Sequence, residues 1–144
     1  ADLEPLPRQI IHSDLHPHNV LMVKDEVAAI IDFDAVRISQ QARDAAFALY
    51  RFGRQFFVSA PRTENEIKRC ARQLKDVFLE DYLKINFFSE KELKSMPILL
   101  KDEFLVKLLF VLRSVYEEKN KTWAKDLNKF MMALREIDYF WPAD

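Results

Sequence analysis

The sequence predicts an α+β domain that is mainly α, with one β-hairpin followed by a bundle of helices. Two apolar runs, Val20–Val23 and Val27–Ile31, flank a charged turn at residues 24–26, which is the pattern of a hairpin. From residue 42 onward, apolar side chains recur at intervals of three and four, which is the period of amphipathic helices. The 144 residues suit a single domain.

This pattern divides residues 1–144 into three parts. We predict a connector over residues 1–9, a loop and hairpin over residues 10–34, and a helical part over residues 42–141. Residues 35–41, between the last two parts, read as a polar connector.

Composition excludes several classes of protein. The apolar fraction of 49% is ample for a core, and the net charge of −1 comes without a basic block that would predict a nucleic-acid partner. No apolar tract, Leu108–Leu112 included, is long enough to cross a bilayer. The first ten residues lack the apolar stretch of a signal peptide. The single cysteine, Cys70, excludes an intramolecular disulfide and fits a reducing compartment. We therefore expect a soluble, cytoplasmic protein with neither nucleic acid nor membrane as partner.

The predicted hairpin is bordered on both sides by polar side chains. Five of them fall within eight residues on the loop before it: His12, Asp14, His16, His18 and Asn19. The triplet Asp32-Phe33-Asp34 follows directly after it. Loops held by rigid elements are where binding and catalytic groups concentrate. A hairpin also brings its two ends together, so Asn19 and Asp32 could share one site.

These residues resemble the phosphoryl-transfer motifs of the protein-kinase-like phosphotransferases. That pattern is H-x-D with an Asn five residues after the Asp, then a hairpin and a D-F-G-type triplet. Here it is written as His12-Ser13-Asp14, Asn19 and Asp32-Phe33-Asp34. The segment at residues 12–19, H-S-D-L-H-P-H-N, is most similar to the H-G-D-L-H-P-G-N motif of the aminoglycoside phosphotransferase and choline kinase group. Ser13 and His18 stand where that group usually has glycine.

The resemblance implies the C-terminal lobe of a kinase-like fold that transfers the γ-phosphate of ATP to a hydroxyl of a small molecule. Phosphoryl transfer needs positioning and charge neutralisation more than covalent chemistry from the protein. Asp14 is then the catalytic base. Asn19 and Asp32 bind Mg²⁺ and, through it, ATP, because Mg²⁺ prefers oxygen ligands. Asp34 is a further candidate ligand. The acceptor stays open among aminoglycosides, choline, homoserine, amino sugars and other alcohols.

The same resemblance assigns structural roles to two other residues. His12 should hold the loop, and Asp44 should open a helix and brace the loop by hydrogen bonds. A plain helix-dipole interaction explains an Asp in the first turn nearly as well.

Kinase-like enzymes also carry an N-terminal lobe, which this sequence lacks, since it contains no G-x-G-x-x-G loop. We expect that lobe to be a partner of this chain, supplied by the same full-length chain or by another. Without it, the isolated 144 residues should bind Mg-ATP poorly, turn over nothing detectable and expose surface that favours self-association.

Two other functions match parts of the sequence. The run Asp14-Leu15-His16 also resembles the D-x-H motif of calcineurin-like metallophosphoesterases, whose histidines and carboxylates bind transition metals. That family needs later glycine and histidine motifs, whereas this chain has one glycine and no histidine after His18. A kinase-like scaffold without turnover is the second possibility, although such a module has no chemical need for Asp14, Asn19 and Asp32 together.

The helical part divides at its capping and breaking residues. We expect helices from Asp44 to Phe57 and after a capping box at residues 63–66, and a short helix after a second box at Ser89 that Pro97 ends. A buried helix should then cover residues 98–116, and a last helix residues 122–139. The apolar seam of that last helix runs through Trp123, Leu127, Phe130, Leu134, Ile137 and Trp141.

Charged side chains of the helical part are assigned to solvent. Arg51 and Arg54 are placed on a solvated face of the first helix, and Asp102-Glu103 is read as ordinary surface charge.

Overall fold

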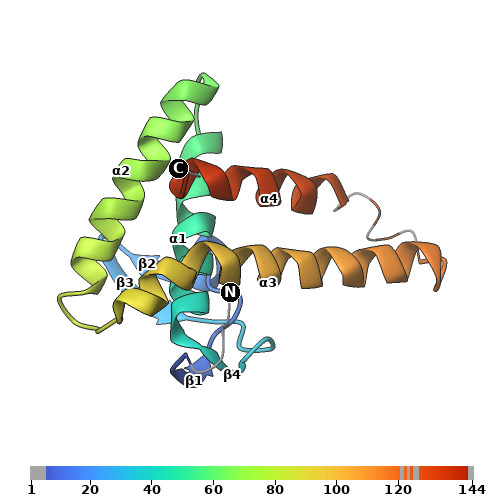
Figure 1. Ribbon diagram of the computed structural model, residues 1–144, viewed down its shortest axis with the longest axis horizontal. Helices are drawn as coiled ribbons and strands as arrows, with labels where there is room; N and C mark the ends of the chain where they lie inside the picture. The colour runs from blue at the N-terminus through green and yellow to red at the C-terminus, as the bar shows by residue number, and fades with distance from the viewer. Residues whose placement is uncertain (1–5, 121, 123, 125–126, 143–144) are drawn as a thin grey trace.

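The computed structural model describes residues 6–120, 122, 124 and 127–142 as a mainly helical molecule (Figure 1). Its helices are α1 (Gln41–Val58), α2 (Glu64–Tyr82), α3 (Glu90–Tyr116), α4 (Leu127–Phe140) and the short 3-10 helix η1 (Pro17–Asn19). Its strands are β1 (Arg8–Ile11), β2 (Val20–Val23), β3 (Glu26–Ile30) and β4 (Arg37–Gln40). The mainly helical class and the hairpin predicted from the sequence are therefore confirmed.

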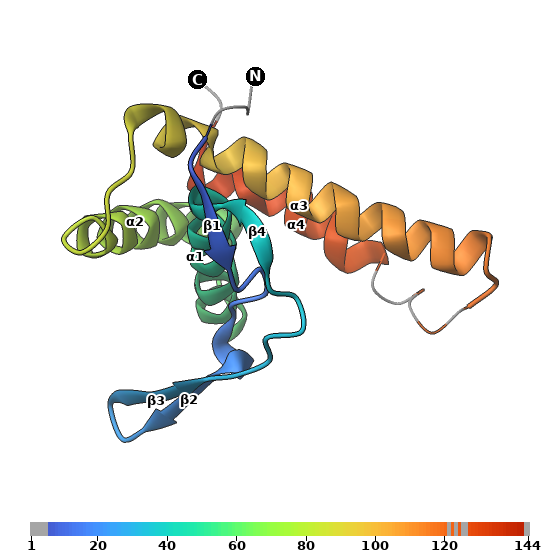
Figure 2. The same cartoon turned by 90° about the horizontal axis from the view of Figure 1, so that it is seen from below.

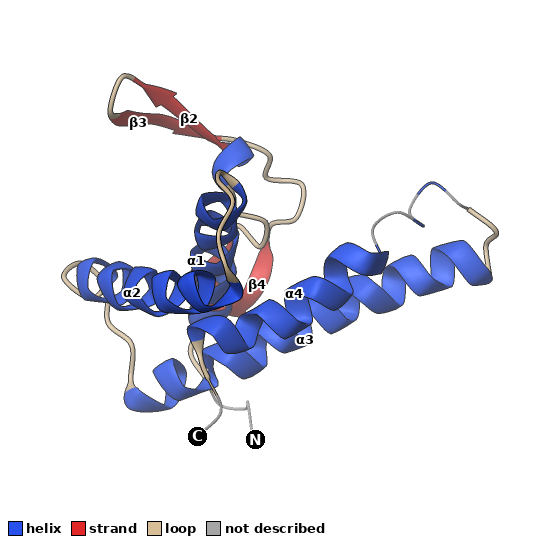
Figure 3. Ribbon diagram, turned by 90° about the horizontal axis from the view of Figure 1, so that it is seen from above, coloured by secondary structure: helices blue, strands red, loops and turns tan. Residues whose placement is uncertain are grey.

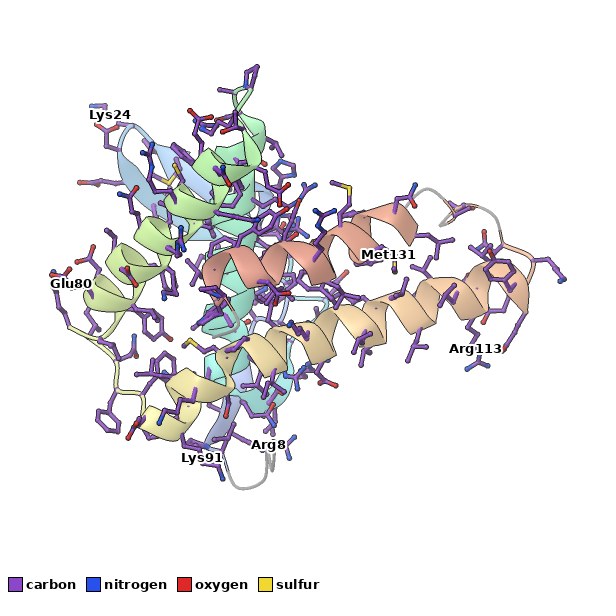
Figure 4. The ribbon with its side chains drawn as sticks, turned by 45° about the horizontal axis from the view of Figure 1, so that its top comes forward. Arg8, Lys24, Glu80, Lys91, Arg113 and Met131 are labelled. Carbon is purple, nitrogen blue, oxygen red and sulfur yellow. The ribbon has the colours of Figure 1, made fainter. Side chains whose placement is uncertain are left out.

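Strands β2 and β3 form the predicted antiparallel hairpin, with Val20 opposite Ile30 and Val23 opposite Glu26. Lys24 occupies the turn with a positive φ of 55° and marks the tip of the hairpin in Figure 4. The hairpin projects from one end of α1, away from the strands β1 and β4 (Figure 2). Its base therefore lies against the helices while its tip points into solvent.

A second antiparallel pair, β1 with β4, was not predicted. Ile11 lies opposite Arg37 and Arg8 opposite Gln40. The connector predicted over residues 1–9 is therefore wrong for residues 8 and 9, and the polar connector over residues 35–41 contains a strand. The alternation is weak in both segments, and Ile10 and Ile38 are exposed, so neither strand has a buried face that its sequence could reveal.

Helix α1 is the element around which the others pack. Its alanines Ala42 and Ala46 are fully buried, which lets neighbouring elements approach its backbone closely. Phe47 and Tyr50 project from it onto Phe104 of α3, with ring centroids 5.8 Å and 5.0 Å apart. Helices α2 and α3 both pack against α1, so it is central to the core.

Both predicted capping boxes are present. The Thr63 side chain accepts a hydrogen bond from Glu66 N at the start of α2, and Ser89 accepts one from Glu92 N at the start of α3. The predicted break at Pro97 is wrong, because α3 is continuous from Glu90 to Tyr116 with Pro97 inside it. A proline there removes one helical hydrogen bond. Complete burial of Met96, Leu99 and Leu100 offsets that loss.

Helices α3 and α4 run side by side as an arm (Figures 1 and 3). Within Phe104–Leu112, which was expected to be buried on nearly every side, only Phe104, Leu108 and Val111 are buried and Leu112 is partly exposed, because α4 covers a single side of the arm. The other apolar residues of that stretch are exposed: Leu105, Val106, Leu109 and Phe110. The seam of α4 turns Ile137 into the core, whereas Trp123 lies outside the described residues.

No helix among the described residues is both long enough and apolar enough to cross a membrane.

At Gly53 of α1, the Phe140 side chain of α4 packs directly against the helix backbone. A Cβ atom at this position would lie 2.7 Å from Cζ of Phe140, a ring that is completely buried. We predict that Gly53→Ala lowers the free energy of unfolding by about 1–3 kcal/mol through overpacking, although alanine favours a helix elsewhere. Urea denaturation measures this difference. Combining Gly53→Ala with Phe140→Leu should cost less than the sum of the two single changes, and strict additivity would contradict the contact.

Candidate functional site

The loop between β1 and η1 is held to α1 by one carboxylate. Asp44, in the first turn of α1, accepts hydrogen bonds from the backbone N–H groups of His12 (3.0 Å) and Ser13 (2.8 Å). Both donors precede Asp14 directly, so the position of the predicted base follows from the position of α1. The negative charge also lies at the N-terminal end of the helix, where the dipole favours it.

The His12 side chain links the loop to the far end of the hairpin. Its Nδ1 accepts from the backbone N–H of Asp14 at 3.4 Å, and its Nε2 lies 3.0 Å from the carbonyl oxygen of Ile31. Since Nδ1 accepts, Nε2 carries the proton and donates to Ile31. The ring also packs against Phe33, with centroids 5.0 Å apart. His12 therefore connects the backbone at Asp14 with the residues on both sides of Asp32.

Asn19 closes the base of the hairpin. Its backbone carbonyl accepts from Ile31 N at 3.0 Å, and its side-chain Nδ2 donates to the carbonyl of Asp14 at 3.0 Å. The side chain is buried, and its Oδ1 is the atom left for another partner. Asp32 follows Ile31 directly. Asp14, Asn19 and Ile31 thus belong to one hydrogen-bonded unit, and Asp32 is the next residue after Ile31, 18 positions from Asp14 in the chain.

Two positions of this unit have a backbone conformation that L-residues seldom adopt. Ser13 has φ 67° and Asp32 has φ 65°. Positive φ is easiest for glycine, which explains physically why glycine is usual in the position of Ser13. Aspartate tolerates it better than most residues. Such conformations cluster at ligand-binding and catalytic sites.

The predicted base, Asp14, lies among cationic and polar groups. Lys107 Nζ of α3 is 3.3 Å from Oδ1, and His16 Nε2 is 3.5 Å from Oδ2. The carboxylate is about one-third exposed, so a small molecule can still reach it. Burial, followed by the charge of Arg51, lowers the pKa of His16, which keeps the imidazole neutral at pH 7.

The predicted metal ligands fit a magnesium ion better than a transition metal. Among the described residues, no three His, Cys, Asp or Glu side chains gather as a metal site. Asp14, Asp32 and Asp34 therefore do not converge as three carboxylate ligands. Mg²⁺ needs fewer protein groups, since it binds through one or two carboxylates together with phosphate and water oxygens. The Asn19 amide oxygen and the exposed Asp32 carboxylate suit that chemistry.

Asp34 lies farther along, in an exposed turn that Val36 N closes onto Phe33 O at 3.1 Å. It does not share the hydrogen bonds that join Asp14, Asn19 and the hairpin. Its role as a ligand stays a prediction.

Lys107 is a site residue that the sequence did not assign. Besides Asp14, it contacts Oε1 of Glu103 at 3.7 Å and lies 4.7 Å from the centroid of the Phe47 ring. Glu103 is buried and accepts from Arg43 of α1 at 3.2 Å, so its reading as surface charge is wrong. Arg37 of β4 also pairs with Glu103. The signal for Lys107 was its place as the lone charge within an apolar stretch of α3.

Arg51 and Arg54 do not lie on a solvated face. Together with His16, they line a cavity of about 60 Å³ beside the loop, to which α4 contributes Phe130. Arg54 Nε donates to Glu136 of α4 at 2.9 Å. The sequence placed these arginines in solvent because the helix that covers them is about 80 residues away along the chain.

The clamp made by Asp44 can be tested directly. Asp44→Ala leaves the backbone N–H groups of His12 and Ser13 without their acceptor, which should cost about 2–3 kcal/mol of unfolding free energy. Amide hydrogen exchange at His12 and Ser13 should accelerate more than exchange in α2. The control is Asp76→Ala on α2, whose carboxylate is 72% exposed and should matter by less than about 0.5 kcal/mol. Unchanged exchange at both amides would show that Asp44 does not hold the loop.

Comparisons with known proteins identify the family of the chain. The model of the phosphotransferase enzyme family matches residues 1–84, more than half of the chain. A homoserine kinase from Methylocella silvestris is 46% identical over 44 residues, which are 31% of this chain and 14% of that protein. A homoserine kinase from Afipia carboxidovorans is 33% identical over 106 residues, 74% of this chain and 29% of that protein.

The chain thus spans less than a third of the length of these relatives. No solved structure matches it significantly. The family match covers the Asp44 clamp, the loop and the hairpin together, and the chain therefore belongs to the phosphotransferase enzyme family.

Proposed function

We propose that this chain supplies the base and the metal ligands of an ATP-dependent kinase that phosphorylates a hydroxyl of a small molecule. The observation that carries the proposal is the hydrogen-bonded unit that joins Asp14, Asn19 and the residue before Asp32. The accessible carboxylate of Asp14 therefore lies at the base of the same hairpin as Asn19 and Asp32, whose side-chain oxygens could bind a metal ion. Family membership and two relatives named as homoserine kinases support the same reaction class.

In the proposed reaction, Asp14 accepts the proton of the acceptor hydroxyl as its oxygen attacks the γ-phosphorus of ATP. The bond from that phosphorus to the β–γ bridging oxygen breaks, and ADP leaves. The ammonium group of Lys107, 3.3 Å from Oδ1, holds the Asp14 carboxylate in one orientation before the transfer. His12 and Asp44 act through the backbone, by fixing where Asp14 stands.

Asn19 and Asp32 are the residues that would hold Mg²⁺ with ATP, and Asp34 is a further candidate. When bound, the ion neutralises charge on the phosphates. The amide of Asn19 is fixed by its bond to Asp14 O, so its oxygen is oriented before any ligand arrives. This preorganisation favours tight binding because little freedom is lost.

The apolar surface of the hairpin supports a second lobe as partner. Large side chains on both of its faces are exposed: Leu21, Met22, Val23, Val27, Ile30, Ile31 and Phe33. A two-stranded hairpin with so much apolar surface is marginal in water unless something packs on it. We propose that the N-terminal lobe of the complete kinase covers it and forms the other wall of the nucleotide site.

Asp14→Asn in the complete protein should lower kcat by about 10²–10⁴-fold, because the amide can no longer accept the hydroxyl proton. The affinity for Mg-ATP should stay nearly unchanged, since Asp14 faces the acceptor. Coupled detection of ADP release measures both quantities. The matched control is Asp25→Asn in the exposed hairpin turn, which should leave kcat unaffected. Near-normal turnover of Asp14→Asn would remove this residue from the role of base.

Asp32→Ala should abolish turnover by removing a carboxylate ligand of Mg²⁺, whereas Asn19→Ala should weaken it and raise the Mg²⁺ concentration needed. Asp34→Ala reports whether that residue is a ligand at all. Titration of turnover with Mg²⁺ distinguishes the three variants. His16 and His18 should not bind the ion, because Mg²⁺ prefers oxygen. Full activity of Asp32→Ala at ordinary Mg²⁺ would contradict the assignment.

A further inference from the structure

Arg51 is a half-buried cation that has no carboxylate partner among the described residues. No hydrogen bond or ion pair joins its guanidinium to another described residue, and its Cζ lies over the Phe47 ring, 5.7 Å from the centroid. Burial lowers the pKa of Arg51, which shows that the guanidinium has lost much of its water. An arginine cannot shed its proton to escape that loss. A buried charge is normally paired, so this one has room for an anion.

The groups that face Arg51 do not supply that anion. Asp14 is the carboxylate whose charge acts most strongly on it, but the Asp14 carboxylate already contacts Lys107 and His16. The carboxylate of Glu136 already accepts hydrogen bonds from Arg54 Nε at 2.9 Å and from the hydroxyl of Tyr50 at 2.6 Å. Burial and the charge of Glu136 raise the pKa of Tyr50 far above its usual value, so Tyr50 stays a donor.

The cavity beside Arg51 is cationic and small. Arg54 contributes its two Nη groups, for which no bond to a described residue exists, and Lys129 of α4 adds a further positive charge. Phe104 and Phe130 form the apolar part of the wall. A volume of about 60 Å³ holds a few water molecules or one small polar group, whereas a sugar ring needs more space.

We propose that this cavity binds the carboxylate of the acceptor, with Arg51 as its main ligand, and that the acceptor is therefore a small hydroxy acid. The inference rests on the proposed function, since it is Asp14 that gives the acceptor hydroxyl a place beside the cavity. The planar guanidinium suits a carboxylate, because two parallel N–H groups can donate to its two oxygens. A cationic acceptor such as an aminoglycoside finds the wrong sign of charge here.

The experiment compares two ligands of equal chain length, one with a carboxylate and the other with an uncharged hydroxymethyl group at the end away from the shared hydroxyl. The complete protein, labelled with ¹⁵N, is titrated with 4-hydroxybutyrate and with 1,4-butanediol, and the side-chain Nε–H signal of Arg51 is followed by NMR. The Arg51→Gln variant assigns that signal and removes the proposed ligand. The matched control is Arg113→Gln, an exposed arginine at the far end of α3 (Figure 4).

We expect 4-hydroxybutyrate to shift the Arg51 signal and 1,4-butanediol to leave it unchanged. Arg51→Gln should weaken 4-hydroxybutyrate binding by about 10- to 100-fold, the worth of a charge-assisted hydrogen bond, and Arg113→Gln should not. Equal binding of both ligands, or binding of neither, would overturn the inference. A shift caused by Mg-ATP or inorganic phosphate but not by 4-hydroxybutyrate would also overturn it, by assigning Arg51 to the nucleotide.

The result does not depend on turnover. A protein that hydrolyses or transfers no phosphate from ATP can still bind the hydroxy acid at Arg51, in which case the proposed function fails and the anion site stands. A kinase that phosphorylates acceptors lacking a carboxylate equally well keeps the proposed function and loses the inference.

Discussion

The carboxylate of Asp44 is the constraint on which the site depends. It accepts from two consecutive backbone amides, those of His12 and Ser13, and so places Asp14 at the N-terminal end of the most buried helix. The other residues that hold the site together are hydrogen-bonded, directly or through one another, to the backbone of Asp14. Asn19 donates to the backbone of Asp14, the hairpin closes on Asn19, and His12 spans from Asp14 to Ile31. The loop has no hydrophobic core of its own, so these hydrogen bonds to the packed helices are what fix its position.

Charge on the other side of Asp14 comes from α3 and reaches the loop through a buried network. Glu103 accepts from Arg43 and contacts Lys107, and Lys107 contacts Asp14. Removing one member of a buried network leaves a charge without its partner, which costs more than the pair contributed. The network therefore fixes the arm of α3 and α4 against the loop, and with it the cavity that contains Arg51. The proposed base, the proposed metal ligands and the proposed anion site are all attached to the same three helices, α1, α3 and α4.

What the sequence predicted was local in the chain. The hairpin, both capping boxes and the closeness of Asn19 to Asp32 follow from residues within about 15 positions of one another, where turn chemistry and alternation dominate. The features that the sequence did not predict depend on contacts between residues that are far apart along the chain. Strand β4 pairs with a partner 26 or more positions away, Pro97 is tolerated because the core packs around it, and Lys107 reaches Asp14 across 93 positions. The arginines of α1 looked solvated because nothing in their neighbourhood along the chain predicts that α4 covers them.

The central claim is that Asn19 and Asp32 hold the metal of a nucleotide whose γ-phosphate faces Asp14. A crystal structure of the complete protein with β,γ-imido-ATP and Mn²⁺ tests it most directly, because the anomalous signal of manganese locates the ion independently of the model. The predicted result is an ion coordinated directly by Asn19 Oδ1 and Asp32, bridging to the phosphates, with the terminal phosphate next to the Asp14 carboxylate. An ion bound by His16 and His18, or a nucleotide that leaves Asn19 and Asp32 without contact, would contradict the claim.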